Sequence, residues 1–203
     1  EMGPGKGLLA KHFLSACRMS PDDSFSRRLR YVLIERSPAM RELQRKNLLH
    51  GLCEPDRITW VDGLDSLPAH SLTGLLFSNE LPDAFPVHRI QIEQGRAQEI
   101  HVDYDGAKFV ECLRPLSSPE VRQYLANLKV TLPEGYQTEI NTAAVRWMEQ
   151  VASAIDRGLA ITIDYGHTAH AVGMRADRAG LLDGAGRRIG VLAGPGDRRD
   201  EDL

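Results

Sequence analysis

The chain reads Leu75-Leu76-Phe77-Ser78-Asn79-Glu80-Leu81-Pro82-Asp83-Ala84-Phe85-Pro86-Val87-His88-Arg89 near its middle. The apolar run at the start of this stretch predicts a buried strand that ends at Asn79-Glu80. Two prolines, Pro82 and Pro86, stiffen the exit because each fixes its own φ and restricts the residue before it. Ligands of open α/β sheets bind at the carboxyl ends of the strands, so we expect a site here.

The sequence before this stretch alternates strand-like and helix-like segments. The predicted order is a glycine-rich turn over 1–7, a helix over 8–19, a strand over 31–34 closing on Glu35, a helix from Pro38 to about Leu49, and a strand over 58–61 closing on Asp62-Gly63. Such alternation is typical of an α/β fold with a doubly wound, mostly parallel sheet of the Rossmann-like type. Polar residues at each strand end would then meet at one edge of that sheet.

The pattern changes after Arg89. Three short alternating runs over 89–113, separated by Gln94-Gly95-Arg96 and Asp105-Gly106, predict an antiparallel β-meander inserted in, or added to, the sheet. Ser118-Pro119-Glu120 begins another helix. We expect a helix over 141–157 that ends at Gly158, and then a strand over 159–163.

We therefore expect one domain over 1–167 and a weakly ordered tail over 168–203, which is rich in Gly, Ala, Arg and Asp. The net charge of −3 gives no support for a nucleic-acid partner, and no apolar run approaches the ~20 residues that would span a membrane. Three widely spaced cysteines form no disulfide framework, which favours a reducing compartment. The pair His167-x-x-His170 supplies too few ligands for a zinc site, so we expect no metal.

Gly3, Gly5 and Gly7 form a G-x-G-x-G pattern before a helix. Glycines let the backbone approach a ligand closely, and a helix N-terminus favours a phosphate or a carboxylate. The dinucleotide pattern G-x-G-x-x-G fails because Leu8 stands where its last glycine belongs, which argues against a nucleotide-dependent oxidoreductase. The alternative is a tight turn without a ligand.

Two acidic residues strengthen the case for a ligand. Glu35 directly follows the predicted strand over 31–34, and its carboxylate can accept hydrogen bonds from both hydroxyls of a ribose. Asp62 can accept a hydrogen bond from the exocyclic amine of a purine. Taken singly, Glu35 could face solvent and Asp62-Gly63 could form a turn. Together with the glycines, their spacing suits a nucleoside that carries an amino-acid carboxylate.

The sequence resembles the MidA-like group of class I S-adenosylmethionine-dependent methyltransferases, whose mitochondrial members act as complex I assembly-factor protein-arginine methyltransferases. The resemblance covers about residues 1 to 168. It rests on Glu1-Met2-Gly3-Pro4-Gly5-Lys6-Gly7, on the Asn79-Glu80 to Pro86-Val87-His88-Arg89 block, on Gly135-Tyr136-Gln137-Thr138-Glu139-Ile140-Asn141 and on Ile163-Asp164-Tyr165-Gly166-His167.

This resemblance implies a methyltransferase that binds S-adenosyl-L-methionine and acts on an arginine of a protein partner. The implied cofactor-binding residues are Glu1, Gly3, Gly5, Glu35, Asp62, Gly63 and Asn79. Glu80 and Asp83 would orient the guanidinium, and His88 would act as a base. Asp83 has a capping or turn role as its alternative, and His88 a structural hydrogen bond. The implied location is the bacterial cytoplasm, or alternatively the mitochondrial matrix.

The chain also departs from this family. The family has a long segment before the glycine loop, including the central first strand of the sheet, and continues past Asp164-Tyr165-Gly166-His167 with further strands. The sequence therefore looks like a fragment truncated at both ends, and we expect reduced stability and weak or absent catalysis for the isolated chain. A non-catalytic assembly or interaction protein that keeps the fold is the alternative function.

Overall fold

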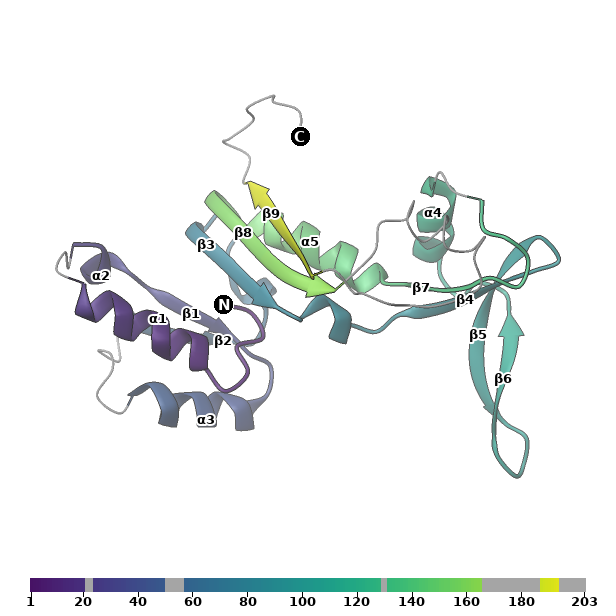
Figure 1. The fold of residues 1–203 in the computed structure, drawn as a ribbon, viewed down its shortest axis with the longest axis horizontal. Coiled ribbons are helices and arrows are strands. Elements are labelled where there is room, and N and C mark those ends of the chain that lie inside the picture. Colours follow the sequence, from purple (N-terminus) through teal and green to yellow (C-terminus); the bar gives the residue numbers. More distant parts are fainter. Residues whose placement is uncertain (21–23, 50–56, 129–130, 166–186, 194–203) are drawn as a thin grey trace. The chain divides into compact units, whose positions relative to one another are not determined.

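The computed structural model describes residues 1–20, 24–49, 57–128, 131–165 and 187–193 (Figure 1). Its elements are α1 (Leu8–Met19), α2 (Ser24–Arg28), β1 (Tyr31–Ile34), α3 (Pro38–Leu49), β2 (Ile58–Val61), η2 (Leu64–Ser66), β3 (Leu72–Asn79), η3 (Pro82–Ala84), β4 (His88–Glu93), β5 (Arg96–Tyr104), β6 (Phe109–Arg114), α4 (Pro119–Asn127), β7 (Gln137–Ile140), α5 (Thr142–Ala154), β8 (Ile155–Tyr165) and β9 (Arg187–Ala193). Gly166, His167 and His170, which carried parts of the sequence prediction, lie outside the described residues.

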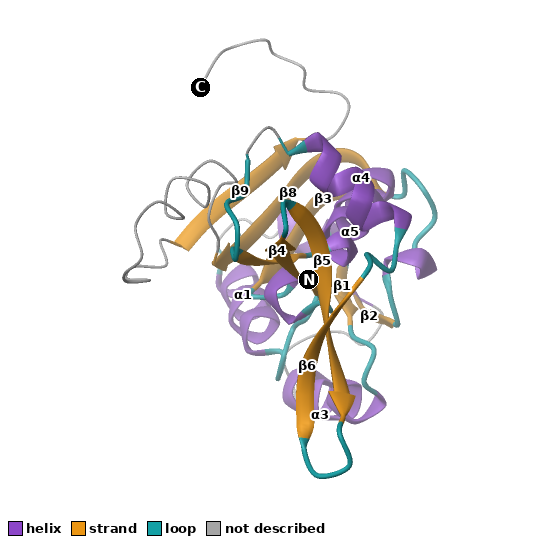
Figure 2. Cartoon of the chain, turned by 90° about the vertical axis from the view of Figure 1, so that its right-hand side faces the viewer, coloured by secondary structure: helices purple, strands orange, loops and turns teal. Residues whose placement is uncertain are grey.

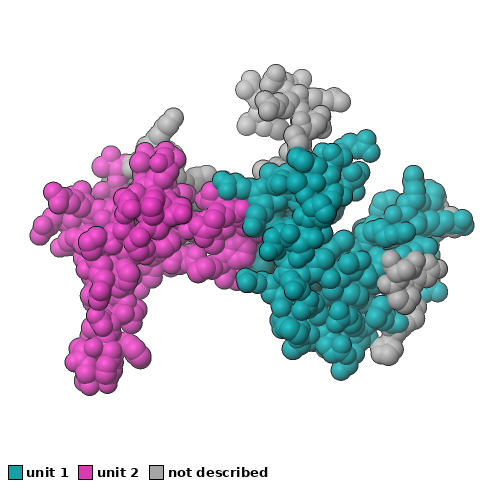
Figure 3. Space-filling view, turned by 180° about the vertical axis from the view of Figure 1, so that it is seen from behind, with its two compact units in different colours: residues 1–81, 149–164, 189–203 teal, residues 82–148, 165–188 magenta. Residues whose placement is uncertain are grey.

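The chain divides into two compact units, coloured separately in Figure 3. The first unit comprises residues 1–81, 149–164 and 189–203, and the second comprises 82–148 and 165–188. We describe each unit by itself.

The first unit contains the parallel strands that the sequence predicts. β1 pairs with β2, and β3 pairs with β8, in both cases in parallel. β9 completes a three-stranded sheet in the order β3-β8-β9. The mixed α/β fold with parallel strands and a separate antiparallel sheet is therefore confirmed.

Helices α1 and α3 contribute to the core beside β1 and β2. Fully or nearly fully buried apolar side chains from all four elements form one cluster, made of Ala10, Leu14, Leu33, Leu48 and Ile58. Leu29, Tyr31 and Trp60 pack against it. Burial of this apolar surface is the main stabilising term for the arrangement, and it packs α1 and α3 against β1 and β2.

The second unit is built on a four-stranded antiparallel sheet in the order β6-β5-β4-β7. The predicted meander is thus a sheet of its own, which gains β7 beside β4. Helix α4 packs on this sheet through Val121, which is buried against Ile90 and Ile140. Ser118 caps α4 by accepting a hydrogen bond from the Val121 N–H at 3.2 Å, as its position before Pro119 suggests.

The boundary between α5 and β8 differs from the prediction. The helix ends at Ala154 instead of Arg157, and Gly158 lies inside β8 instead of ending the helix. Ile155 continues the apolar stripe of the helix in sequence, but in the structure it pairs with Leu72 at the start of the β3–β8 ladder. Pairing with a strand some 80 residues away overrides the local helical pattern here.

β3 also differs in burial from the fully buried strand that the sequence suggests. Leu76 and Ser78 are buried, whereas Leu75 is 52% exposed, because successive side chains of a strand point to opposite faces. One strand, β9, lies inside the region 168–203, for which the sequence predicts a weakly ordered tail. That prediction did not include a strand at 187–193, and the rest of the tail lies outside the described residues.

None of the described helices is long and apolar enough to cross a membrane. Among the described residues, no group of three or more His, Cys, Asp and Glu side chains is arranged to hold a metal ion.

Candidate functional site

The first three residues join β1 to β3. The Met2 N–H donates to the Phe77 carbonyl oxygen at 2.9 Å, and Met2 forms parallel bridges to Ile34 and to Ser78. The Gly3 N–H donates to the Ile34 carbonyl oxygen at 3.2 Å. The glycine loop therefore starts between the carboxyl ends of two parallel strands, where an open α/β sheet binds its ligands.

Glu35 and Asp62 follow neighbouring strands. Ile34 and Val61 are the last partners in the parallel β1–β2 ladder, and the Glu35 N–H donates to the Val61 carbonyl oxygen at 2.9 Å. The two acidic residues thus sit at adjacent strand ends, as the sequence predicts, and Glu35 directly follows the strand end that holds Gly3.

The glycine loop needs glycine for its backbone. Gly3, Gly5 and Gly7 have φ values of 67°, 52° and 76°, in the left-handed region that costs other residues about 1–2 kcal/mol. A Cβ atom added to Gly5 would meet no other atom within 4 Å. The backbone at Gly5 therefore borders open space, into which a ligand could fit closely. The helix that follows, α1, has no side-chain cap at its N-terminus.

The Glu35 carboxylate is held from two sides. Its Oε1 accepts a hydrogen bond from the Ser37 N–H at 2.8 Å, and its Oε2 accepts one from Gln44 Nε2 at 3.3 Å. An ionised carboxylate offers about four lone-pair sites, so two remain for further donors. Glu35 is partly exposed, so its oriented carboxylate can accept hydrogen bonds from a ligand such as the hydroxyls of a ribose.

Asp62 and Glu1 have partners within the chain. Asp62, whose side chain is 70% exposed, pairs with the guanidinium of Arg41. The Glu1 carboxylate accepts a hydrogen bond from the Tyr31 hydroxyl at 2.6 Å. Burial of the Tyr31 side chain, together with its bond to Glu1, raises the pKa of the Tyr31 hydroxyl, so this group stays a donor.

β3 ends at Asn79 and Glu80 follows it, at the place where the sequence predicts the strand to end. Asn79 pairs with Ile163 in the last described step of the β3–β8 ladder. Glu80 follows with a φ of 47°, which is uncommon for a residue other than glycine. Residues in such conformations occur often at functional sites, where the surrounding structure holds them.

Asp83 and His88, the other two predicted catalytic residues, belong to the second unit. Asp83 lies in η3, and His88 is the first residue of β4. The structure does not bring these two together with Glu80 as parts of one described unit. Their catalytic roles stay predictions.

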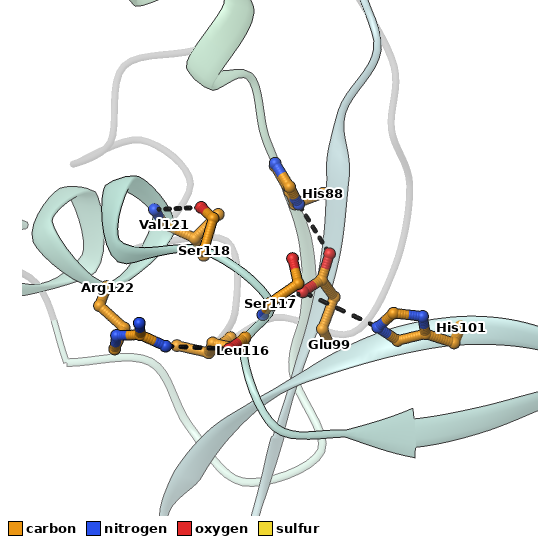
Figure 4. Close-up of polar contacts among 8 residues, drawn as sticks. All are labelled: His88, Glu99, His101, Leu116, Ser117, Ser118, Val121 and Arg122. Atoms are coloured by element: carbon orange, nitrogen blue, oxygen red, sulfur yellow. Dashed lines mark hydrogen bonds and ion pairs between the residues drawn. The ribbon is translucent and has the colours of Figure 1, made fainter.

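The environment of His88 is well defined (Figure 4). Its Nδ1 lies 2.6 Å from Oε1 of Glu99, a side chain on β5 that is only 8% exposed. The Ser117 N–H donates to the other oxygen of Glu99 at 2.7 Å. Burial alone would raise the pKa of Glu99, but the hydrogen bonds from His88 and Ser117 outweigh it and lower this pKa to about 2.

His101 completes this cluster. Its Nε2 lies 3.8 Å from Glu99 Oε2, beyond hydrogen-bonding distance, and is itself buried without a hydrogen-bond partner. For His88, the alternative to a catalytic role was a structural hydrogen bond, and its Nδ1 makes such a bond to Glu99. The other ring nitrogen of His88, Nε2, is the atom that would act as a base.

Sequence reasoning missed two residues, Gln44 and Glu99. Gln44 is fully buried on α3, where it bonds Glu35 and the glycine loop. A polar residue four positions before the buried Leu48, in the inward-facing stripe of the helix, was the available signal. Glu99, a carboxylate beside the apolar Ile100 in a strand, gave a similar but weaker signal.

The sequence of the chain matches a known protein family. A family model described as "Putative S-adenosyl-L-methionine-dependent methyltransferase" matches residues 1–181 of the 203. The predicted cofactor is the one that this description names.

The chain is also similar to individual proteins and solved structures. The chain is 26% identical over 192 residues to a Drosophila melanogaster protein named "Protein arginine methyltransferase NDUFAF7 homolog, mitochondrial", and the match covers 82% of this chain and 42% of that protein. A crystal structure of an uncharacterised protein from Burkholderia thailandensis is 31% identical, with a TM-score of 0.68, over 86% of this chain and 45% of that one. A second structure from that organism, bound to S-adenosyl-homocysteine, has the same identity and TM-score over 86% of this chain and 44% of that one.

The chain therefore spans less than half the length of these relatives. Its first unit, with the glycine loop between the ends of β1 and β3, carries the parallel strands of the class I type of methyltransferase. The family match over most of the sequence leads to one conclusion: the chain belongs to the family of S-adenosyl-L-methionine-dependent methyltransferases.

Proposed function

We propose that this protein transfers a methyl group from S-adenosyl-L-methionine to an arginine side chain of a protein partner. The observation that carries the proposal is the convergence of Gly5 and Glu35 on one amide nitrogen, Nε2 of Gln44, at 2.7 and 3.3 Å. The convergence supports a site in which the backbone that would lie under an amino-acid group is next to the carboxylate that would bind a ribose.

The residues that would hold the cofactor all belong to the first unit. Gly3 and Gly5 would lie under the methionine part, Glu35 would accept from the ribose hydroxyls, and Asp62 with Gly63 would bind the adenine end. Glu1, just before the glycine loop, and Asn79, the last residue of β3, would complete the site. When bound, S-adenosyl-L-methionine supplies a methyl group on a positively charged sulfur.

The remaining chemistry falls to the chain's own side chains. Glu80 would orient the acceptor guanidinium, since the two oxygens of a carboxylate match its planar fork of N–H donors. A guanidinium nitrogen that gains a methyl group must lose a proton to a base. Asp83 and His88 belong to the second unit, and their roles in orienting the acceptor and in accepting a proton stay predictions. Methyl transfer depends mostly on such positioning and on charge complementarity.

The substrate class is supported by the fruit-fly relative, whose name states that it is a protein arginine methyltransferase. That relative is named as mitochondrial, whereas the matching solved structures come from a bacterium. We accordingly propose a cytoplasmic protein if the source is bacterial and a mitochondrial matrix protein if it is not. A role in complex I assembly would follow only in the second case.

The experiment is transfer of a labelled methyl group to the proteins of a cell extract by the protein expressed from its complete gene. We expect labelling that amino-acid analysis traces to methylarginine. Glu80→Ala should abolish the labelling while binding of S-adenosyl-homocysteine survives. Label on lysine or on a small molecule would refute the arginine substrate, and full transfer by Glu80→Ala would refute the role of Glu80.

A second function, a non-catalytic interaction protein, is favoured by one feature of the second unit. The hairpin of β5 and β6 extends past the other strands of its sheet (Figure 2), and its end exposes Val102, Tyr104 and Phe109 at 66%, 57% and 78%. Exposed aromatic residues of this kind are enriched at protein interfaces. Cofactor binding without any methyl transfer, combined with loss of a partner in Phe109→Ala, would support this function over the first.

A further inference from the structure

We propose that Gln44 is a positioning residue for cofactor binding, which locks the glycine loop and the Glu35 carboxylate into a single arrangement before the ligand arrives. This inference deepens the proposed function and rests on it. It concerns a residue on α3 that is fully buried and that no sequence motif of the site includes.

The contacts of Gln44 reach three separate segments. Its Nε2 donates to the Gly5 carbonyl oxygen at 2.7 Å and to Glu35 Oε2 at 3.3 Å. Its Oε1 accepts from Trp60 Nε1, on β2, at 3.0 Å. One amide group therefore connects the glycine loop, the end of β1 and the neighbouring strand.

The orientation of this amide follows from the chemistry of its partners. The Trp60 indole nitrogen can only donate, so it must face the amide oxygen. A carbonyl and a carboxylate can only accept, so they must face the amide nitrogen. A flipped amide would leave all three bonds unmade, at a cost of about 1–3 kcal/mol for each polar group of the buried Gln44 amide left without a partner.

Trp60 is itself restrained. The Arg45 guanidinium lies over its ring, 5.0 Å from the ring centre, in a cation–π contact. The donor that orients the Gln44 amide is thus held in place from another position on α3.

A second side chain of α3 holds the same loop. Asn47, three residues after Gln44 and so on the same side of the helix, donates from Nδ2 to the Lys6 carbonyl oxygen at 2.9 Å. A Cβ atom added to Gly7 would touch Gln44 Cγ at 3.4 Å, so the loop also packs against the stem of Gln44. With two successive carbonyl oxygens engaged, the peptide planes after Gly5 and Lys6 are fixed.

Such a preset arrangement strengthens binding because the ligand does not have to order the loop. A near-isosteric change tests it. Gln44→Glu keeps an acceptor for Trp60 but replaces the N–H donors with an oxygen that faces a carbonyl and a carboxylate. We expect the affinity for S-adenosyl-homocysteine at pH 8 to fall about tenfold or more, which corresponds to loss of one hydrogen bond to a charged group.

The same variant provides a pH signature that simple destabilisation would not give. A buried carboxyl group next to another carboxylate takes up a proton more readily than usual, and once protonated it can donate again. The affinity of Gln44→Glu should therefore recover at least partly between pH 8 and pH 6. The wild-type protein should show no comparable gain.

The measurement is calorimetric titration of S-adenosyl-homocysteine into the protein expressed from its complete gene. Gln123→Glu is the matched control, because Gln123 makes its side-chain bond to Asn127 at an exposed position on α4. Nuclear magnetic resonance gives an independent readout through the indole N–H signal of Trp60, which donates to Gln44. The Trp60 signal should stay at a shift typical of a hydrogen-bonded indole in Gln44→Glu, which retains an acceptor, and lose that shift in Gln44→Met.

The outcomes separate the two proposals. Absence of S-adenosyl-homocysteine binding by the wild-type protein would refute the proposed function. Tight binding by the wild type and equally tight binding by a folded Gln44→Glu would overturn only the role of Gln44. Should Gln44→Glu not fold, Trp60→Phe replaces it: this variant frees the amide oxygen and should weaken binding about threefold or more, and unchanged affinity would overturn the inference.

Discussion

The backbone N–H of Glu80 donates to the carbonyl oxygen of Ile163 at 2.7 Å, one step beyond the last pair of the β3–β8 ladder. The bond holds Glu80 at a φ of 47° as the chain leaves the sheet. A residue that carries a proposed catalytic carboxylate is thus fixed by the neighbouring strand at the carboxyl edge of the sheet. The left-handed backbone has a cost that substitution can reveal.

Replacing Glu80 by glycine should leave the protein more stable than replacing it by alanine. Both variants lack the carboxylate, but only alanine keeps the Cβ atom that disfavours a positive φ, at about 1–2 kcal/mol. We expect the free energy of unfolding of Glu80→Gly to exceed that of Glu80→Ala by about 1 kcal/mol in urea titrations. Equal stabilities would show that the backbone of residue 80 is not left-handed in solution.

Gly158→Ala should destabilise the first unit severely. A Cβ atom at Gly158 would lie 1.8 Å from the Gly74 carbonyl oxygen, across the β3–β8 ladder, so the two strands would have to separate. We expect a loss of about 3 kcal/mol or more, at the upper end for overpacking. Gly74→Ala is the matched control, since Gly74 also has a positive φ, of 146°, but a Cβ there would meet nothing within 4 Å. Similar losses in both variants would contradict the close approach.

Stability should fall in acid through Glu99. The folded pKa of this carboxyl is about 2, below its value of about 4.3 in an unfolded chain, so the stabilisation is present above pH 4.3 and is lost as the pH falls toward 2. Glu99→Gln should remove this part of the pH dependence. Urea titrations between pH 7 and pH 2 would measure it.

The matched control for Glu99 is Glu111→Gln. Glu111 pairs with Arg89, but its side chain is 54% exposed, and exposed ion pairs contribute little. This variant should follow the acid profile of the wild type. A Glu99→Gln profile that also follows the wild type would mean that the bonds from His88 and Ser117 do not hold the carboxylate in solution.

Local sequence signals predicted the early part of the fold closely. The helix at 8–19 and the strands at 31–34 and 58–61 have the predicted bounds in the structure, because apolar runs there are flanked by glycine, proline and polar end signals. The end of α5 was not predictable in this way, since Ile155 suits both a helix stripe and a strand that pairs with Leu72. The close approach of Gly74 and Gly158 was not predictable either, because these residues are far apart in sequence.

The candidate site shows the same division. The positions of Glu35 and Asp62 were predictable because strand ends in a parallel sheet meet at one edge, and their binding roles stay predictions. The proposed role of Gln44 was not predictable, because it depends on hydrogen bonds to three segments that come together only in the folded chain. Asp83 and His88 follow Glu80 closely in sequence but fall in the other unit, so sequence proximity alone could not establish a shared site.

The central claim is that the glycine loop and Glu35 form one binding site for an adenosyl amino acid. The most direct measurement is calorimetric titration of S-adenosyl-homocysteine into the wild-type protein and into Glu35→Ala, both expressed from the complete gene. We predict binding of one molecule per chain, weakened by a factor of about 10 or more in the variant through loss of charge-assisted bonds to the ribose. Absence of binding, or equal affinity in Glu35→Ala, would contradict the claim.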